Sequence, residues 1–183
     1  MFRRDDRPGA VTRAAGQVPD STGVDPVRFR EVVGRFPTGV TVVSAHAGGR
    51  HHGMTANSFT SVSLDPVLVL VCVERDARLH DLVLAAGEWG VSVLAADQEG
   101  VSRLFAERGR SSADALRSVR HRYGELTGAV LLDGALATFE CRTVAVHGGG
   151  DHIVLLGEVL GMELPRPEAG PLVYYRGGYR GLD

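Results

Sequence analysis

The sequence predicts a mainly β protein, a β-barrel with peripheral helices. Strand-like runs rich in β-branched residues dominate the chain. Helical patterns are few, and they do not alternate regularly with the strands as they do in a parallel sheet. The chain also lacks a G-x-G-x-x-G segment, which argues against a Rossmann domain. The expected strands cover residues 39–45, 53–63, 67–73, 89–95, 135–147 and 152–164.

The composition excludes several classes of protein. The 183 residues suffice for one domain with a sizeable core, and 44% of them are hydrophobic. A net charge of −2 implies no basic surface for nucleic acid. All 20 basic residues are Arg, so a Walker phosphate loop and a Schiff-base lysine are excluded. No apolar run reaches about 18 residues, so no contact with a membrane is expected.

The chain is expected to divide into a tail and one domain. Residues 1–24 are rich in Arg, Asp, Pro and Gly and predict a flexible N-terminal tail, whereas residues 25–183 form the domain. Asp25 and Pro26 provide an N-cap and a first-turn proline for a helix that ends at Pro37. The helix has an apolar face with i, i+3, i+4, i+7 spacing, made of Phe29, Val32, Val33 and Phe36.

Two further helices are expected among the strands. Asp76 is placed to cap a helix that ends at Gly87, and Asp97 is placed to cap the next one. Their apolar positions are Leu79, Leu82 and Val83 in the first, and Val101, Leu104 and Phe105 in the second. Turns are expected at Gly48–Gly49 and at Asp65–Pro66.

The C-terminal half is expected to contain one long hairpin. Residues 107–127 are polar and Arg-rich and predict a long loop with a helical turn. Gly148–Asp151 separates the two longest strands and is a strong hairpin signal. Cys72 and Cys141 lie in apolar runs without metal-ligand spacing, which predicts free thiols in a reducing cytoplasm.

The segment Gly53–Ser63 is the most informative part of the chain. It holds six small polar side chains and no formal charge. As a strand it offers hydroxyl and amide hydrogen-bonding groups on short side chains, so a large planar ligand such as a flavin ring can lie against it. A Ser/Thr-rich surface strand is the alternative interpretation of the same residues.

The order of several short motifs resembles the short-chain flavin reductase family. The motifs are Arg35-Phe-Pro-Thr-Gly-Val-Thr-Val-Val43, Gly53-Met-Thr-Ala-Asn-Ser-Phe59, Ser61-Val-Ser-Leu-Asp-Pro66, Gly90-Val-Ser-Val-Leu94, Gly134-Ala-Leu-Ala137, Glu140-Cys-Arg142, Gly150-Asp-His152 and Pro171-Leu-Val-Tyr-Tyr-Arg-Gly-Gly-Tyr179. The resemblance covers about residues 25–182.

This resemblance implies an FMN-binding split β-barrel and a homodimer with sites near the subunit interface. The implied activity is hydride transfer from NADH or NADPH to FMN or FAD. The implied partner is a separate flavin-dependent monooxygenase that receives the reduced flavin.

The resemblance also implies which residues contact the flavin. These are Met54, Thr55, Ala56, Asn57, Ser58, Ser61, Val62 and Ser63, together with Cys72 and Val73 at the end of the next strand. For Thr55 and Ser61, strand capping or cross-strand pairing is the alternative. Arg78 begins a helix and, with the helix N–H groups, suits a phosphate; pairing with Asp76 or Asp81 is the alternative. Many relatives carry Ser or Thr where Asp76 and Ala77 stand, which leaves the phosphate contacts open.

The nicotinamide is expected to meet the hairpin and the C-terminal segment. Gly150-Asp-His152 resembles the position that contacts the nicotinamide substrate, which makes His152 the candidate catalytic residue. The other candidate substrate contacts are Tyr175, Arg176, Gly177, Gly178 and Tyr179, whose rings and guanidinium suit stacking and pyrophosphate pairing. Tyr174 is expected to be structural. His147 and His152 flank the hairpin, but no carboxylate or thiolate ligand set accompanies them, so no metal site is expected.

Two other functions stay open at this point. One is a split-barrel flavoprotein that retains its flavin and acts directly as an oxidase or monooxygenase. The other is a non-catalytic flavin-binding protein. Tight flavin retention without NAD(P)H turnover would indicate the former, and flavin affinity without any hydride donor would indicate the latter.

Overall fold

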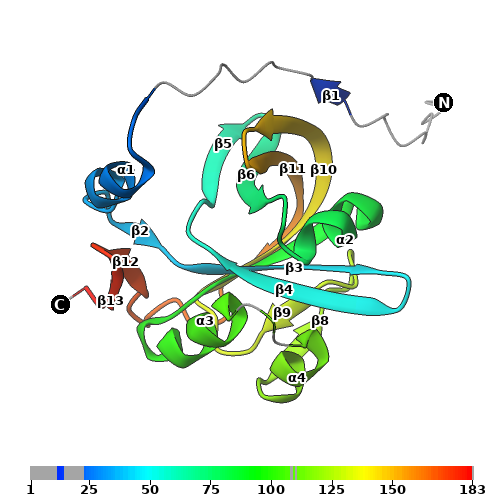
Figure 1. The fold of residues 1–183 in the computed structure, drawn as a ribbon. Helices are drawn as coiled ribbons and strands as arrows, with labels where there is room; N and C mark the ends of the chain where they lie inside the picture. Colours follow the sequence, from blue (N-terminus) through cyan, green and yellow to red (C-terminus); the bar gives the residue numbers. More distant parts are fainter. Residues whose placement is uncertain (1–11, 15–22, 108, 110, 183) are drawn as a thin grey trace.

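One strongly curved sheet forms the body of the protein. The computed structural model describes residues 12–14, 23–107, 109 and 111–182. In the main sheet the strands follow the order β4-β3-β7-β10-β11-β6-β5, and β1 (Thr12–Ala14) pairs in parallel with the far end of β10 (Figure 1). The other strands are β3 (Thr41–Ala47), β4 (Arg50–Ala56), β5 (Thr60–Leu64), β6 (Val67–Glu74), β7 (Glu88–Val93), β10 (Ala137–Gly149) and β11 (His152–Glu163).

The sheet closes on itself through the segment 57–59. β4 and β5 are the two ends of the strand order, yet only residues 57–59 separate them in sequence. Three residues span at most about 11 Å, so the two edges must lie near each other. The Ser58 hydroxyl accepts from the Cys72 backbone N–H at 3.0 Å and contacts the Cys72 carbonyl oxygen at 3.2 Å, which fastens this segment to β6. The predicted fold class, a mainly β barrel with peripheral helices, is confirmed, and the open barrel is consistent with a split barrel.

The single strand expected over 53–63 is therefore wrong. The chain bends at Asn57, and β4 pairs with β3 whereas β5 pairs with β6. Alternation of side chains cannot continue through a bend, so the residues before and after it do not share one face. The Ser/Thr-rich composition marks the crossing between two strands rather than one long strand.

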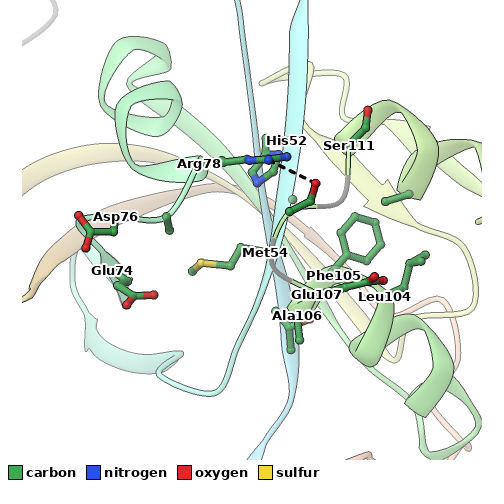
Figure 2. Close-up of a pocket in the computed structure, with 15 residues that line it drawn as sticks. His52, Met54, Glu74, Asp76, Arg78, Leu104, Phe105, Ala106, Glu107 and Ser111 are labelled. Carbon is green, nitrogen blue, oxygen red and sulfur yellow. Dashed lines mark hydrogen bonds between the residues drawn. The ribbon is translucent and has the colours of Figure 1, made fainter.

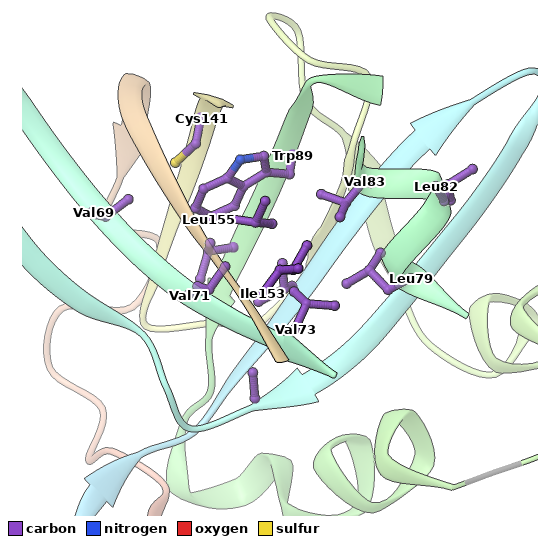
Figure 3. Packing of buried hydrophobic residues seen from close by; sticks show 14 residues of the cluster. Val69, Val71, Val73, Leu79, Leu82, Val83, Trp89, Cys141, Ile153 and Leu155 are labelled. Carbon is purple, nitrogen blue, oxygen red and sulfur yellow. The ribbon is translucent and has the colours of Figure 1, made fainter. Parts of the chain in front are cut away.

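The core lies inside the curve of the sheet. Trp89 of β7 is fully buried there among aliphatic side chains from β3, β6 and β11 (Figure 3). Its indole N–H donates to the Thr143 hydroxyl at 3.1 Å, which satisfies the polar atom of this buried ring. Gly157 of β11 faces the ring closely, because a Cβ there would lie 2.4 Å from Cζ2 of Trp89. The close approach of β11 to Trp89 requires glycine at this position.

The helices lie outside the barrel, as expected, but their caps differ from the prediction. They are α1 (Pro26–Val33), α2 (Leu79–Ala86), the short 3₁₀ turn η1 (Ala96–Gln98), α3 (Glu99–Ala106) and α4 (Ser112–Arg117). Asp25 caps α1 and Gly87 ends α2 in the left-handed region, as predicted. Asp76 and Asp97 do not cap: Arg78 precedes α2, Gln98 precedes α3, and Asp97 pairs with Arg166 at 3.0 Å.

The structure also contains short strands that the sequence did not predict as separate elements. β8 (His121–Tyr123) pairs with β9 (Val130–Leu132), and β2 (Thr38–Gly39) joins a small sheet with β12 (Val173–Tyr175) and β13 (Gly178–Arg180). Three-residue strands are too short for an alternating pattern to reveal them. The small sheet attaches the C-terminal hairpin beside the start of β3 (Figure 1).

The predicted tail of residues 1–24 lies largely outside the described residues, so its mobility stays a prediction. Among the described residues, no helix is long and apolar enough to cross a membrane.

Candidate functional site

A cleft of about 390 Å³ opens beside β4, which is one edge of the sheet (Figure 2). Its walls come from β4, from the loop that joins β6 to α2, and from the end of α3 with the segment that follows it. The lining residues are His52, Gly53, Met54, Thr55, Glu74, Asp76, Ala77, Arg78, Leu104, Phe105, Ala106, Glu107, Gly109, Ser111 and Ala115. This size is within the range of about 300–1,000 Å³ that is usual for small-molecule sites.

Close packing against α3 fixes the β4 wall. A Cβ on Gly53 would lie 3.0 Å from the Phe105 ring, so glycine allows the strand to approach the helix. The Thr55 hydroxyl donates to the Ser102 carbonyl at 2.7 Å, at the level of the next turn. Met54 points into the open side of the cleft (Figure 2). β4 therefore presents its backbone and the side chains of His52 and Met54 to a ligand.

Arg78 lies at the entrance of α2 and extends across the cleft toward His52 (Figure 2). One guanidinium nitrogen donates to the Gly109 carbonyl at 3.3 Å, which connects the two walls. Burial and then the neighbouring Arg78 charge lower the pKa of His52, so its imidazole is neutral near pH 7. Of the two alternative partners predicted for Arg78, Asp81 contacts His80 at 2.8 Å and Asp76 lines the cleft.

The loop wall of the cleft is acidic. Glu74 lines it from the end of β6, Asp76 from the β6–α2 loop, and Glu107 from the opposite side. Asp76 was predicted to lie beside Arg78, whereas Glu74, Glu107 and the α3 residues were not predicted for the site, because tertiary packing brings them there from separate segments. The signal available was the cluster of charges in Glu74-Arg-Asp-Ala-Arg78, directly after a buried strand.

The predicted flavin contacts fall into three groups. Met54, Thr55 and Arg78 line the cleft. Ala56, Asn57 and Ser58 continue from it into the crossing segment, where Ser58 meets Cys72 of β6. Burial raises the pKa of the Cys72 thiol, and the Ser58 contact opposes this in part. The Val73 side chain is fully buried in the core, so only its backbone faces outward.

Ser61, Val62 and Ser63 lie on β5, past the bend, and do not line the cleft. Val62 is 47% exposed, and the Ser63 hydroxyl accepts from the Asp65 backbone N–H at 3.2 Å in the adjoining turn.

His152 lies at the edge of the acidic wall. It begins β11 and pairs in register with Glu74 of β6. Its Nδ1 is 2.7 Å from the Asp151 carboxylate, which lowers the pKa of that carboxyl. The Arg75 backbone N–H donates to the Asp151 carbonyl at 2.9 Å, so the hairpin and the cleft loop are tied together.

The C-terminal hairpin reaches the site from the other side, along α3. The Tyr179 hydroxyl is 2.8 Å from the Ser102 hydroxyl, and the Arg103 guanidinium lies 5.0 Å from the centroid of the Tyr179 ring. Tyr174 packs edge-on against Tyr179, in the structural role expected of it. The junction from β12 to β13 contains the remaining predicted nicotinamide contacts, Tyr175, Arg176, Gly177 and Gly178. The Arg176 backbone N–H donates to the Gly34 carbonyl at 2.9 Å. Among the described residues, no hydrogen bond or ring contact joins His152 to this hairpin.

Tyr179 borders a neighbouring cavity of about 520 Å³ that shares part of the cleft wall. Leu104, Ala106 and Glu107 line both the cleft and this cavity. Within the part of the chain that the structure describes, no group of three or more His, Cys, Asp or Glu residues could hold a metal ion.

Comparison with known proteins gives consistent matches over most of the chain. The family model "Flavin reductase like domain" matches residues 33–183. An NADH-dependent FAD reductase of Streptomyces globisporus is 48% identical over 146 residues, which cover 78% of this chain and 80% of the relative. The reductase subunit HsaB of a flavin-dependent monooxygenase from Mycobacterium tuberculosis is 37% identical over 164 residues, which cover 89% and 86%.

A solved structure shares the fold. The S. globisporus C-1027 NADH:FAD oxidoreductase SgcE6, determined in complex with NAD and FAD fragments, superposes with a TM-score of 0.82 at 43% identity. The match covers 87% of this chain and 93% of the other.

Proposed function

The chain belongs to the flavin reductase like domain family, and from this premise we propose its function and its site. It is an NAD(P)H:flavin oxidoreductase that transfers a hydride from nicotinamide to FMN or FAD. The reduced flavin is supplied to a partner monooxygenase; the mycobacterial relative is named as the reductase subunit of a flavin-dependent monooxygenase. The observation that carries the site is the cleft beside β4, in which an uncharged strand wall faces one arginine at a helix entrance.

The flavin occupies this cleft, with its ring along Met54 and Thr55 and its phosphate at Arg78. The backbone of β4 and the crossing segment supply uncharged hydrogen-bonding groups for the ring edge. Arg78 and the first N–H groups of α2 together suit a phosphate dianion. The carboxylates of Glu74, Asp76 and Glu107 repel the phosphate from the remaining walls, which favours one orientation of the ligand.

Bound flavin supplies the hydride-accepting chemistry. The residues around it hold the two rings in contact and exclude water, so a general acid or base is not required for the hydride itself. Ser58 and Cys72 fix the crossing segment beneath the ring. The Thr55 hydroxyl donates its hydrogen bond to the Ser102 carbonyl, so Thr55 positions β4 against α3.

The nicotinamide approaches between the acidic wall and the C-terminal hairpin. His152, beside Glu74, and Tyr179, beside the shared wall of Leu104 and Glu107, border the cleft from different sides. Tyr175, Arg176, Gly177 and Gly178 extend this second side. Because His152 and Tyr179 border the cleft from different sides, we infer that residues near a subunit interface complete the nicotinamide site.

The functional unit is a homodimer in the cytoplasm. α1 has no buried residue although it carries a row of large apolar side chains, with Phe29 58% and Val32 57% exposed, and Phe36 just beyond the helix is 72% exposed. An exposed apolar surface of this kind is usually buried against another surface. A second copy of the chain is the partner that agrees with the family resemblance. The free cysteines Cys72 and Cys141 suit a reducing compartment.

Flavin titration of an Arg78 variant tests the site. Arg78→Ala removes charge-assisted hydrogen bonds to the phosphate, each worth about 1.5–3 kcal/mol, so the Kd for FMN should rise roughly tenfold or more. Riboflavin lacks the phosphate, and its binding should not change. Arg142→Ala is the matched control, because Arg142 pairs with Glu88 away from the cleft. Equal FMN affinity in wild type and Arg78→Ala would remove Arg78 from the site.

A further inference from the structure

The helix α3 connects the two walls between which the proposed site lies. On one side, its Phe105 ring packs closely against Gly53 of β4, the strand along which the flavin is proposed to lie. On the other side, Arg103 and Leu104 line the cavity of about 520 Å³ together with Tyr179 of the C-terminal hairpin. The placement of α3 therefore sets how far the nicotinamide side lies from the flavin side.

One residue of α3, Ser102, is hydrogen-bonded to both walls. Its backbone carbonyl accepts from the Thr55 hydroxyl of β4 at 2.7 Å, and its side-chain hydroxyl is 2.8 Å from the Tyr179 hydroxyl. Ser102 is fully buried, so solvent cannot replace Tyr179 as the partner of this hydroxyl, and loss of the contact carries a desolvation cost. The two contacts use different atoms of Ser102, so a substitution can remove one and keep the other.

The ring of Tyr179 is held at further points. The Arg103 guanidinium lies 5.0 Å from the ring centroid, and an ion pair of 2.7 Å with Glu99, one helical turn earlier, keeps this guanidinium on α3. Tyr174 packs edge-on against the ring at a centroid distance of 5.4 Å. Because Ser102 fixes the hydroxyl and these neighbours fix the ring, Tyr179 faces the cavity in a single orientation.

We propose that Ser102 is a positioning residue for hydride transfer, because it holds Tyr179, and with it the nicotinamide, at a set distance from the flavin wall. This rests on the proposed function, which places the flavin along Thr55 and the nicotinamide beside Tyr179. Reacting atoms must come within about 3–3.5 Å of each other, and a misplacement of about 1 Å costs roughly a hundredfold in rate. Ser102 contacts neither ligand and acts through Thr55 and Tyr179.

A double-mutant cycle tests the contact between Ser102 and Tyr179. Ser102→Ala removes the hydroxyl but keeps the carbonyl that accepts from Thr55, and Tyr179→Phe removes the partner hydroxyl but keeps the ring. Each change should lower the single-turnover rate of flavin reduction at saturating NADH roughly threefold to tenfold, the effect of one lost hydrogen bond. The double variant should be no slower than the slower single variant, because both changes remove the same contact.

Two further measurements separate positioning from a general loss of structure. The Kd for FMN should stay within about twofold in all three variants, because the flavin wall is left intact. The charge-transfer absorbance of oxidised FMN stacked with tetrahydro-NADH, an unreactive analogue, reports ring placement without turnover and should weaken in each variant. Ser118→Ala should change neither. It is the control because its hydroxyl also donates to a helix carbonyl, that of Asp114 at 2.9 Å, but lines neither the cleft nor the cavity beside Tyr179.

The outcomes separate this proposal from the proposed function. An unchanged rate in either single variant, or effects that multiply in the double variant, would overturn the positioning role. A loss confined to KM for NADH, or an equal loss of FMN affinity, would overturn it as well. If Ser102→Ala does not fold, Tyr179→Phe tests the same contact from the hairpin. A wild type that gives the charge-transfer absorbance without reducing flavin would contradict the reductase, while this absorbance in the variants would still decide the role of Ser102.

Discussion

At the scale of single residues, the crossing segment joins the fold to the site. Asn57 is exposed at the bend, and Ser58 next to it is held by the Cys72 backbone. Because the Cys72 backbone fixes Ser58, the neighbouring Asn57 side chain is held where it can face a ligand. The polar residues of this segment therefore have two roles: Ser58 fastens the segment to β6, and Asn57 is available to a ligand.

Replacement of Asn57 by Leu should weaken flavin binding. The change removes an amide that can hydrogen-bond the ring edge, worth about 0.5–1.5 kcal/mol, so the Kd should rise roughly threefold to tenfold. Fluorescence quenching on titration with FMN measures this. Asn57→Asp keeps the shape and serves as the comparison; an unchanged Kd in a folded Asn57→Leu variant would place the ring elsewhere.

The buried thiol of Cys141 should make stability depend on alkaline pH. Burial, and then the Glu140 charge, raises the pKa of Cys141 from 9.0 to about 12. Because the folded pKa exceeds the unfolded one, the stabilisation is complete below pH 9.0 and is lost as the pH rises toward 12.

Denaturant titrations across this pH range measure the loss. Cys141→Ala should show a smaller decline than wild type over the same range, and Cys72→Ala is the comparison at a thiol that is only half-buried. At pH below 9.0, native Cys141 should resist alkylation and react after unfolding. An equal decline in wild type and Cys141→Ala would exclude this thiol as the cause.

At the scale of the elements, close strand packing at two glycines shapes the barrel. Gly53 admits Phe105 of α3 against β4, and Gly157 admits Trp89 against β11. Both contacts join elements that are far apart in sequence, so no local sequence pattern predicts them. This is why the sequence predicted the main strands and the hairpin, but not the surroundings of the cleft.

Gly157→Ala should destabilise the protein. The added Cβ would lie 2.4 Å from Cζ2 of Trp89, and the ring is fully buried and hydrogen-bonded to Thr143, so it has little room to move. Overpacking of this kind costs about 1–3 kcal/mol. Chemical denaturation measures the change, and Gly100→Ala, which meets nothing within 4 Å, is the control. Equal stability of both variants would contradict the packing described for Trp89.

The elements that the sequence predicted well are those with strong local signals. Asp25 caps α1, Gly87 ends α2, and the hairpin at Gly148–Asp151 joins β10 and β11 as expected. The bend at Asn57 was missed because Ser and Thr are compatible with both a strand and a turn. For the site, Met54, Thr55 and Arg78 were predicted and line the cleft, whereas Glu74, Glu107 and the end of α3 are brought there by tertiary packing alone.

At the scale of the whole molecule, the exposed apolar face of α1 is the surface on which the proposed homodimer rests. Val32 is 57% exposed and Phe29 58% exposed, both on α1, which lies at the periphery of the fold (Figure 1). Burial of such side chains contributes about 1.5–3 kcal/mol each, which a second copy of the chain can supply.

The double variant Phe29→Asp with Val32→Asp should convert a dimer into a monomer. Sedimentation at micromolar concentration reports the mass directly. Arg28→Asp, on the polar part of α1, is the control and should remain dimeric. A wild-type protein that sediments as a monomer would contradict the proposed homodimer, and a double variant that stays dimeric would place the interface elsewhere.

The activity assigned to this protein is hydride transfer from a nicotinamide to a flavin. Anaerobic rapid mixing of the protein with excess FAD and with NADH or NADPH measures this transfer, because the visible flavin absorbance disappears on reduction. We expect rapid loss of this absorbance with at least one nicotinamide, at a rate proportional to protein concentration and reduced in the Arg78→Ala variant. Flavin reduction no faster with the protein than without it, for both nicotinamides and for both FMN and FAD, would show that the protein does not catalyse this transfer.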